Sequence, residues 1–254
     1  MKMHGFVFRI GEKFISIAES MEARTSGLGH NAYRDCFFTI RRLIRLHRPV
    51  NVCDVGANEG HWSLILSSLC SSIRHITLFE PQPELNQSLQ KLTIPGVKTA
   101  CFPIALGEFR EKGVLHSNTA SASLLVPGEA QHRLFPGSIE HVDQRVSVDT
   151  LDNIYADNDL PIPDLIKIDV QGGELAVLKG ATRLLRQARV VVAEISFQTF
   201  YQGQPACWEL LRFLQEQNFV LADWGYAWRA SAAPHEVLQA DGIFVQPAPI
   251  RAEN

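Results

Sequence analysis

The chain has 254 residues, of which 46% are hydrophobic and 20% charged, with a net charge of -3 and a pI of about 6.3. This composition is typical of a globular protein with one large core, and it argues against a general nucleic-acid-binding surface. The five cysteines are scattered without a C-x-x-C pair, so neither a structural zinc site nor a redox motif is indicated.

Residues 1–49 have apolar residues at helical spacing and predict an N-terminal helical extension. Its second half carries four arginines, which we interpret as a solvated helix face rather than a phosphate- or membrane-binding patch: Arg41, Arg42, Arg45 and Arg48. Pro49 ends this helix. No apolar run reaches the ~18 residues that span a membrane, and we recognise no secretory signal. We therefore expect a cytoplasmic protein that has no membrane partner.

The rest of the chain, residues 50–254, is predicted to form one α/β domain, and residues 50–60 are its most informative stretch. They predict a buried strand, a glycine-bearing turn and a helix N-terminus, with Asp54 near the strand's carboxyl end. Gly56 and Gly60 allow a sharp turn and a close approach to a ligand. A strand, a glycine turn and a helix N-terminus together form a site for an anionic group, such as a carboxylate or phosphate.

The spacing of this turn narrows the choice of cofactor. The dinucleotide fingerprint G-x-G-x-x-G needs its second glycine so that a pyrophosphate can approach the backbone. Here Asn58 occupies that position, so a ligand with a single carboxylate and an amino group fits better than a pyrophosphate.

A second strand is predicted at His75–Glu80, and a third runs near Val97 to Leu106. Glu80 lies at the carboxyl end of the second strand, where an acidic side chain typically binds ribose hydroxyls because two carboxylate oxygens match a vicinal diol. Capping of the next helix is the alternative role for Glu80.

Residues 107–148 are the least regular part of the chain, with short strands expected at Glu111–His116 and Arg145–Val148. The segment is too long for a plain strand-to-helix connection, and it occupies the position of a substrate lid between the third and fourth main strands. Its histidines are better explained as surface residues than as catalytic bases: His116, His132 and His141.

Two further buried strands end near acidic residues. Asp169 follows the apolar run at 165–168, and Glu194 lies at the end of the run at 190–195. A helix at 205–217 and strands at 219–224 and 242–245 complete the domain.

Alternating strands and helices with short connections predict a doubly wound, mainly parallel sheet, which binds ligands beyond the carboxyl ends of its strands. Four acids gather at that edge in spite of their separation in sequence: Asp54, Glu80, Asp169 and Glu194. This arrangement suits a cationic, hydroxyl-rich cofactor such as S-adenosylmethionine (SAM), which carries a sulfonium, an ammonium and a ribose diol.

Four strings in this order resemble the FkbM family of class I SAM-dependent methyltransferases: V-x-D-V-G-A-N-E-G, F-E-P, P-I-A-L-G-E and D-L-I-K-I-D-V-Q-G-G-E-L-x-V-L-K-G-A. The last string, Asp164 to Ala181, is the most specific to that family. The resemblance covers about residues 50–196 and implies a seven-stranded, Rossmann-like sheet with an antiparallel last strand. It also implies methyl transfer to a hydroxyl oxygen, often of a sugar or polyketide.

The resemblance also assigns roles to particular residues. It implies that the methionine part of SAM is lined by Asp54, Gly56, Asn58 and Gly60, and that Glu80 takes the ribose hydroxyls. Ala105 and Leu106 are implied to lie near the adenine, and Asp169 near the transferred methyl and the acceptor. The chain departs from the family pattern at Gln171, where members commonly have Glu, so that a charge beside the site is absent.

An alcohol that accepts a methyl group must lose its proton, so a general base is expected. Asp169 is the first candidate, Glu194 the second and a histidine of the 107–148 segment the third. Asp169 has the alternative role of capping the helix that begins near Glu174. A divalent metal shared by Asp169 and Glu194 is a further alternative, but no third ligand is evident and we predict no metal site.

Three other functions remain open from the sequence. One is a nucleotide-cofactor oxidoreductase, and another is a SAM-fold binding module without activity. The third keeps methyl transfer but uses RNA or protein as the acceptor, and the low positive charge makes RNA the weaker choice. We expect a small hydroxylated acceptor, such as a sugar, and no nucleic-acid partner. The apolar N-terminal helices leave a homo-oligomer open.

Overall fold

The structure is a computed structural model, and it describes residues 32–117, 122–135, 142–229 and 235–247. The first half of the predicted N-terminal extension therefore lies outside the described residues, as does His141. The described helices are α2 (Ala32–Leu46), α3 (His61–Leu69), α4 (Pro83–Leu89), α5 (Glu129–Leu134), α6 (Leu151–Asp157), α7 (Glu174–Lys179), α8 (Thr182–Leu185) and α9 (Cys207–Glu216). None of them is long and apolar enough to span a membrane.

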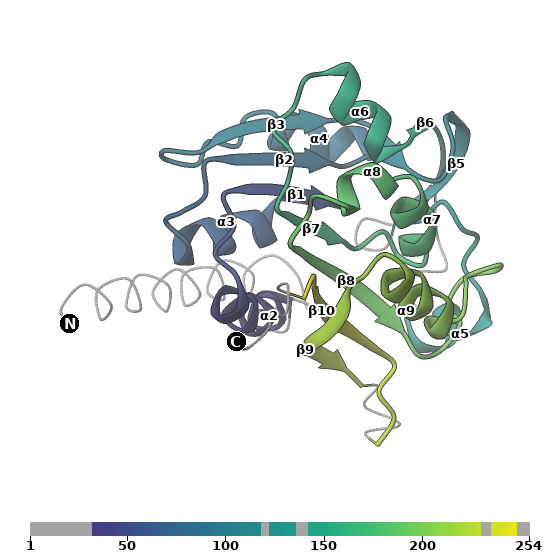
Figure 1. The fold of residues 1–254 in the computed structure, drawn as a ribbon. Coiled ribbons are helices and arrows are strands. Elements are labelled where there is room, and N and C mark those ends of the chain that lie inside the picture. Colours follow the sequence, from purple (N-terminus) through teal and green to yellow (C-terminus); the bar gives the residue numbers. More distant parts are fainter. Residues whose placement is uncertain (1–31, 118–121, 136–141, 230–234, 248–254) are drawn as a thin grey trace.

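A seven-stranded sheet forms the centre of the molecule (Figure 1). In spatial order its strands are β3 (Lys98–Phe102), β2 (His75–Phe79), β1 (Asn51–Val55), β7 (Leu165–Ile168), β8 (Val190–Ser196), β10 (Gln239–Val245) and β9 (Val220–Trp228). Strands β3 to β8 pair in parallel, whereas β10 is antiparallel to both β8 and β9. The predicted doubly wound sheet with an antiparallel last strand is confirmed.

Helices cover both faces of this sheet because its strands are apolar on both sides. One core cluster joins the sheet to α2, α3 and α4, with Ile40, Leu43 and Leu66 fully buried. The other cluster joins it to α6, α7, α8 and α9, and includes Val177 and Leu214. Burial on both faces fixes the strand ends, so the carboxyl edge is a rigid platform for a site.

A second, three-stranded sheet corrects the prediction of one continuous third strand from Val97 to Leu106. The chain leaves the main sheet after Phe102, and Pro103 stands at the break, where it supplies no N–H for a ladder. The new sheet has the order β4 (Ala105–Leu106), β6 (Val142–Asp149) and β5 (Glu111–Ser117). The irregular segment 107–148 thus contains regular structure that packs beside the main sheet.

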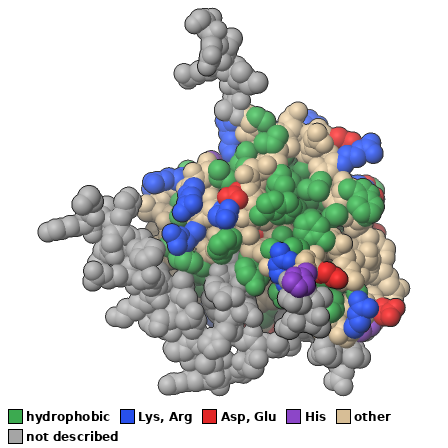
Figure 2. Space-filling model, turned by 90° about the horizontal axis from the view of Figure 1, so that it is seen from below, with side chains coloured by type: hydrophobic (Ala, Val, Ile, Leu, Met, Phe, Trp, Pro, Cys, Tyr) green, Lys and Arg blue, Asp and Glu red, His purple; other side chains and the backbone are tan. Residues whose placement is uncertain are grey.

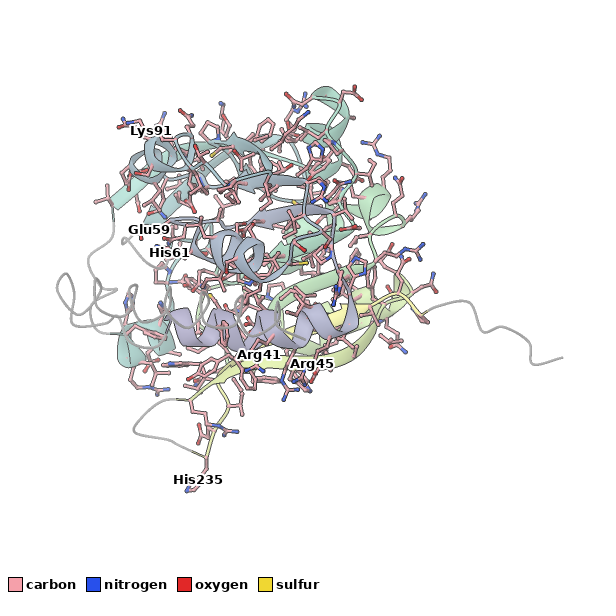
Figure 3. The ribbon with its side chains drawn as sticks, turned by 90° about the vertical axis from the view of Figure 1, so that its left-hand side faces the viewer. Arg41, Arg45, Glu59, His61, Lys91 and His235 are labelled. Carbon is pink, nitrogen blue, oxygen red and sulfur yellow. The ribbon has the colours of Figure 1, made fainter. Side chains whose placement is uncertain are left out.

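Helix α2 packs against β9 and β10 at one end of the sheet. Thr39 Oγ1 donates to Asp241 Oδ2 at 2.5 Å and accepts from the Tyr226 backbone N–H at 3.0 Å, while Arg42 pairs with Asp223. Figure 3 places Arg41 and Arg45 along this helix, and both are exposed, which agrees with a solvated helix face.

The same end of the molecule carries exposed apolar side chains. Figure 2 shows a broad hydrophobic area on the face seen from below, with Lys and Arg side chains beside it. Large apolar residues of α2 and β9 are exposed by 38–45% of their surface: Phe38, Leu46, Leu221 and Trp224. Whether a second copy of the chain covers this face stays a prediction.

Candidate active site

A cavity of about 410 Å³ opens at the carboxyl edge of the parallel strands, between the two sheets. Among the residues expected from the sequence, six line it: Gly56, Asn58, Glu80, Ala105, Leu106 and Asp169. The other three do not line it: Asp54, Gly60 and Glu194. The volume falls in the range of small-molecule binding clefts.

The turn after β1 is shaped by a close approach to β7. Gly56 has φ = +74°, and a Cβ there would lie 1.8 Å from the backbone oxygen of Asp169. The backbone N–H groups of Gly56 and Ala57 both donate to Phe79 O at 3.0 Å. Glycine is therefore required at position 56 by the packing of the chain on itself, and that packing places the turn against the cavity.

Glu80 connects this turn to the next strand. Its Oε2 accepts from the Asn58 backbone N–H at 2.8 Å, and its Oε1 accepts from the Gln82 backbone N–H at 3.0 Å. Burial raises the pKa of Glu80, and these hydrogen bonds offset part of that rise. Its Oε1 also accepts from Gln82 Nε2 at 3.2 Å, so Oε2 is the oxygen that keeps a second lone pair for a hydroxyl group in the cavity.

Asp54 is fully buried below the cavity floor, where it binds protein groups instead of facing the cavity. Its Oδ2 accepts from Ser63 Oγ at 2.7 Å, and its Oδ1 lies 3.1 Å from Lys167 Nζ. Lys167 is the cross-strand neighbour of Asp54 in β7 and also donates to Gly56 O at 2.8 Å. Burial by itself lowers the pKa of Lys167, but the carboxylates of Asp54 and Asp169 raise it above its usual value.

Lys167 is thus an organising residue that the sequence analysis did not single out. The available signal was a lysine inside the otherwise apolar strand Leu165–Ile168. A lysine in a strand buried on both faces requires a buried partner, because an unpaired ammonium is costly to desolvate. The identity of that partner depends on strand order, which places β1 beside β7.

Gly60 begins α3 with φ = +80°, and a Cβ there would lie 3.0 Å from side-chain atoms of Leu89 and Leu92. Glu59 and His61 flank it on the outer side of the turn, with His61 Nε2 3.3 Å from Glu59 Oε2 (Figure 3). Gly60 therefore serves the turn and its packing against α4.

The second sheet supplies an apolar wall of the cavity. Ala105 and Leu106 of β4 are buried there beside Leu115 of β5 and Val148 of β6. Phe79 lies on the main-sheet side and stacks on Phe102 with ring centroids 5.3 Å apart. This wall suits a flat, apolar ring system.

Asp169 is a partly exposed acid of the site, and Glu108 and Glu111 also line the cavity. Its side chain keeps 40% of its surface exposed, and its Oδ2 lies 3.8 Å from Lys167 Nζ. Gln171, in a left-handed conformation with φ = +59°, donates from Nε2 to Asp169 Oδ1 at 2.9 Å. Tyr201 Oη in turn donates to Gln171 Oε1 at 3.1 Å. Asp169 is thereby held from two sides while its carboxylate still reaches the cavity.

Helix α7 is not capped by Asp169, since its N-cap residue is Gly173, without a side-chain cap. Glu174 instead holds the turn that precedes the helix, with Oε1 accepting from the backbone N–H groups of Val170 at 3.0 Å and Gly172 at 3.1 Å. The alternative role of Asp169 as a helix cap is therefore wrong, which leaves its carboxylate available for chemistry.

Glu194 lies beside Asp169, one strand further along the sheet. Its Oε2 accepts from Gln239 Nε2 at 2.8 Å, and Gln171 Nε2 lies 3.4 Å away. Burial and the neighbouring carboxyl groups of Asp169 and Glu174 raise the pKa of Glu194 well above its usual value. Glu194 does not line the cavity that contains Glu80, so it is less well placed than Asp169 to accept a proton there.

A third acid completes a cluster that a metal ion would need. Ligand atoms of Asp169, Glu174 and Glu194 all lie within 4.8 Å of one another. The Gln171 amide donates toward two of them, and Glu174 Oε1 already accepts two backbone hydrogen bonds. The three carboxyl groups still lie close enough together to hold a cation, and Glu174 is the third acid that the sequence analysis did not identify.

Comparison with known sequences decides the family. The methyltransferase FkbM domain matches residues 54–221 of this chain, about two thirds of its length. The chain belongs to the FkbM methyltransferase family. The matched range begins at Asp54 and ends in β9, so it contains both strand ends that carry Asp54 and Asp169.

Two curated relatives share this region. The hexuronic acid methyltransferase AglP of Haloferax volcanii is 26% identical over 144 residues, which cover 56% of this chain and 54% of AglP. The 2-O-methyltransferase NoeI of Sinorhizobium fredii is 25% identical over 214 residues, which cover 79% of this chain and 82% of NoeI. The chain thus spans about half the length of AglP.

Among solved structures, a putative O-methyltransferase from Klebsiella pneumoniae has a TM-score of 0.50 at 11% identity, over 92% of this chain and 90% of that one. This likeness supports the fold: the FkbM domain here has the class I methyltransferase architecture.

The histidines considered as third-choice bases lie away from the FkbM cavity. His116 Nδ1 is 2.7 Å from Asp143 Oδ1, across the β5–β6 pair. His132 lies in α5, and neither residue lines the cavity. Of the candidate bases named from the sequence, Asp169 is the one among the described residues that lines this cavity.

Proposed function

We propose that this FkbM domain transfers the methyl group of SAM to a hydroxyl oxygen of a small acceptor such as a sugar. The observation that carries the proposal is the placement of Glu80 and Asp169 in one 410 Å³ cavity, with an apolar wall beside them. This arrangement provides a separate partner for each chemically distinct part of the cofactor.

The residues fit SAM in three respects. Glu80 lines the cavity, and its Oε2 can accept a hydrogen bond from a ribose hydroxyl group. Ala105 and Leu106 offer a buried apolar surface to the adenine. The turn at Gly56 and Asn58, which is followed by the N-terminus of α3, suits the carboxylate and amino group of the methionine part.

When bound, SAM supplies a methyl group whose bond to sulfur breaks as the acceptor oxygen bonds to carbon, with the electron pair passing to sulfur. The protein then has two tasks, which are to align the acceptor oxygen with this bond and to remove the hydroxyl proton. We assign proton removal to Asp169, with Gln171 and Lys167 holding its carboxylate in place. Such a base contributes about 10²–10⁴-fold to the rate.

The relatives support a hydroxylated acceptor. AglP is named for a hexuronic acid and NoeI for 2-O-methylation, so both names are consistent with a small acceptor bearing hydroxyl groups. An acceptor of this kind needs no positively charged surface, in agreement with the net charge of -3. The absence of a nucleic-acid partner, the cytoplasmic location and the domain boundary near residue 50 stay predictions.

The oxidoreductase alternative is disfavoured by the turn after β1. Asn58 has φ = +49°, and its Oδ1 accepts from the Glu59 backbone N–H at 2.7 Å, so a side chain fills the space that a pyrophosphate needs. A SAM-fold module without activity is the other alternative, and the exposed Asp169 counts against it.

The testing experiment is calorimetric titration of the purified chain with SAM, S-adenosylhomocysteine and NAD. We expect micromolar binding of the first two and no heat from NAD. Glu80→Ala should abolish binding of both sulfur ligands, whereas Glu84→Ala, at an exposed position in the first turn of α4, is the matched control and should retain it. NAD binding without SAM binding would overturn the proposal.

A further inference from the structure

A second cavity, of about 290 Å³, lies on the other side of Asp169 from the proposed cofactor site. Asp169 and Gln171 line both cavities, so they form the boundary between them. A group bound in the second cavity therefore meets the same carboxylate that faces the first. This is the geometry required for an acceptor whose hydroxyl group must reach Asp169.

One part of the second cavity is aromatic. Phe135, directly after α5, and Trp228, at the end of β9, stack with ring centroids 4.8 Å apart and an interplanar angle of 23°. Both side chains are only partly buried, so ring surface remains accessible. An aromatic surface of this kind packs against the C–H face of a pyranose ring while the hydroxyl groups point to polar partners.

The other part is polar and acidic. Gln239 donates from Nε2 to Glu194 Oε2 at 2.8 Å and to Ser196 Oγ at 3.2 Å, and Asp241 lies beside it on β10. Together with Asp169, three carboxyl groups line the cavity, and no lysine or arginine is among its described lining residues. Lys167 is close, but it is buried and directed to Asp54. A negatively charged acceptor would have no cation to pair with here.

We infer that the second cavity is the acceptor site and that it takes a neutral or amino-substituted pyranoside in preference to a hexuronate. The inference rests on the proposed methyl transfer and goes beyond it by naming the acceptor class. It also predicts that this chain prefers a different acceptor from AglP, whose name refers to a hexuronic acid.

The test measures methyl transfer from SAM to methyl β-D-glucopyranoside and to two probes that each differ from it at one position. They are its 2-amino-2-deoxy analogue, changed at C2, and methyl β-D-glucuronide, changed at C6. We expect kcat/KM for at least one of the first two probes to exceed that for the glucuronide by about 10-fold or more, as one unfavourable charge contact produces. Equal or greater turnover of the glucuronide would overturn the inference.

Substitutions of Trp228 test the location of the acceptor site. Trp228→Ala should raise KM for the preferred glycoside about 10-fold and leave the Kd for SAM unchanged, because the ring touches only the second cavity. Trp208→Ala, whose side chain is 68% exposed on α9, is the matched control and should change neither value. Trp228→Phe keeps an aromatic ring and should restore most of the affinity, which separates loss of stacking from misfolding.

A positive charge introduced into the second cavity tests the preference for a neutral or amino-substituted acceptor. Gln239→Lys places a cation in the cavity and should shift the ratio of glucuronide to neutral glycoside turnover upward by about 10-fold. An unchanged ratio, or an unchanged KM in Trp228→Ala, would overturn the placement of the acceptor. SAM binding without methylation of any probe would overturn the acceptor class, while failure to bind SAM would overturn the proposed function itself.

Discussion

The ends of β1 and β7 carry the same residue type in different roles. Asp54 and Asp169 both lie close to Lys167 Nζ, at 3.1 and 3.8 Å. Asp54 is wholly buried and bound by Ser63, whereas Asp169 keeps 40% of its side-chain surface exposed and lines two cavities. A position at the carboxyl edge of the sheet therefore does not define a role. Burial and the partners of each carboxylate define it, so the first acid stabilises the platform and the second is available to react.

Asp169→Asn is the change with the largest expected effect. It removes the proposed proton acceptor but keeps the shape of the side chain, so turnover should fall about 10²–10⁴-fold, with the Kd for SAM within a few-fold of the wild type. Single-turnover kinetics and calorimetry measure the two quantities. Asp157→Asn, an exposed surface change, is the control. Full activity of Asp169→Asn would show that another group removes the hydroxyl proton.

Asp54→Ala tests whether the buried acid of β1 has the structural role that its burial indicates. It leaves the buried Lys167 ammonium without its nearest carboxylate, so we expect a loss of about 3–5 kcal/mol in the free energy of unfolding, measured in urea. SAM binding should weaken as well, because Lys167 also holds the Gly56 carbonyl. The double variant Asp54→Leu with Lys167→Met should recover much of the stability. A stable Asp54→Ala would show that the ion pair is dispensable.

Gly56→Ala tests the contact between the turn after β1 and the end of β7. The new Cβ would meet the Asp169 carbonyl oxygen, so the loss of stability should be about 3 kcal/mol or more. Gly203→Ala is a matched control, since that residue has the same φ of +74° and nothing within 4 Å of the added atom. The control should lose only about 1–2 kcal/mol, the cost of the left-handed conformation for alanine. Equal losses in the two variants would argue that φ alone requires the glycine.

Glu174→Gln tests how the acids beside Asp169 respond to pH. Burial raises the pKa of Glu174 from 4.5 to about 7, so the folded state binds this proton more tightly than the unfolded state. The unfolding free energy of the wild type should therefore decrease as pH rises from about 4.5 to about 7, by up to about 3 kcal/mol.

The Glu174→Gln variant lacks this group and should gain stability relative to the wild type over the same interval. Urea unfolding at pH 4.5 and pH 8 measures the difference. Glu216→Gln, an exposed change on α9, should follow the wild type at both pH values. Parallel pH profiles of Glu174→Gln and the wild type would contradict the raised pKa.

Local patterns in the sequence determined the strand, glycine turn and helix at residues 50–60, the parallel sheet and the acids at its edge. Each depends on residues that are close along the chain: apolar periodicity, glycine at a turn and an acid at a strand end. The four strings that resemble the FkbM family also predicted the class of reaction, because they consist of the same local features.

Tertiary structure decided which of these acids faces a ligand. Asp54 is withdrawn from the edge by Lys167, a residue from another strand, and Asp169 is held by Gln171 and Tyr201. The break after Phe102 and the second cavity likewise depend on contacts among distant segments, such as that of Phe135 with Trp228. Burial and charge pairing are properties of the folded surroundings of a residue, so residue type and position along the chain do not determine them.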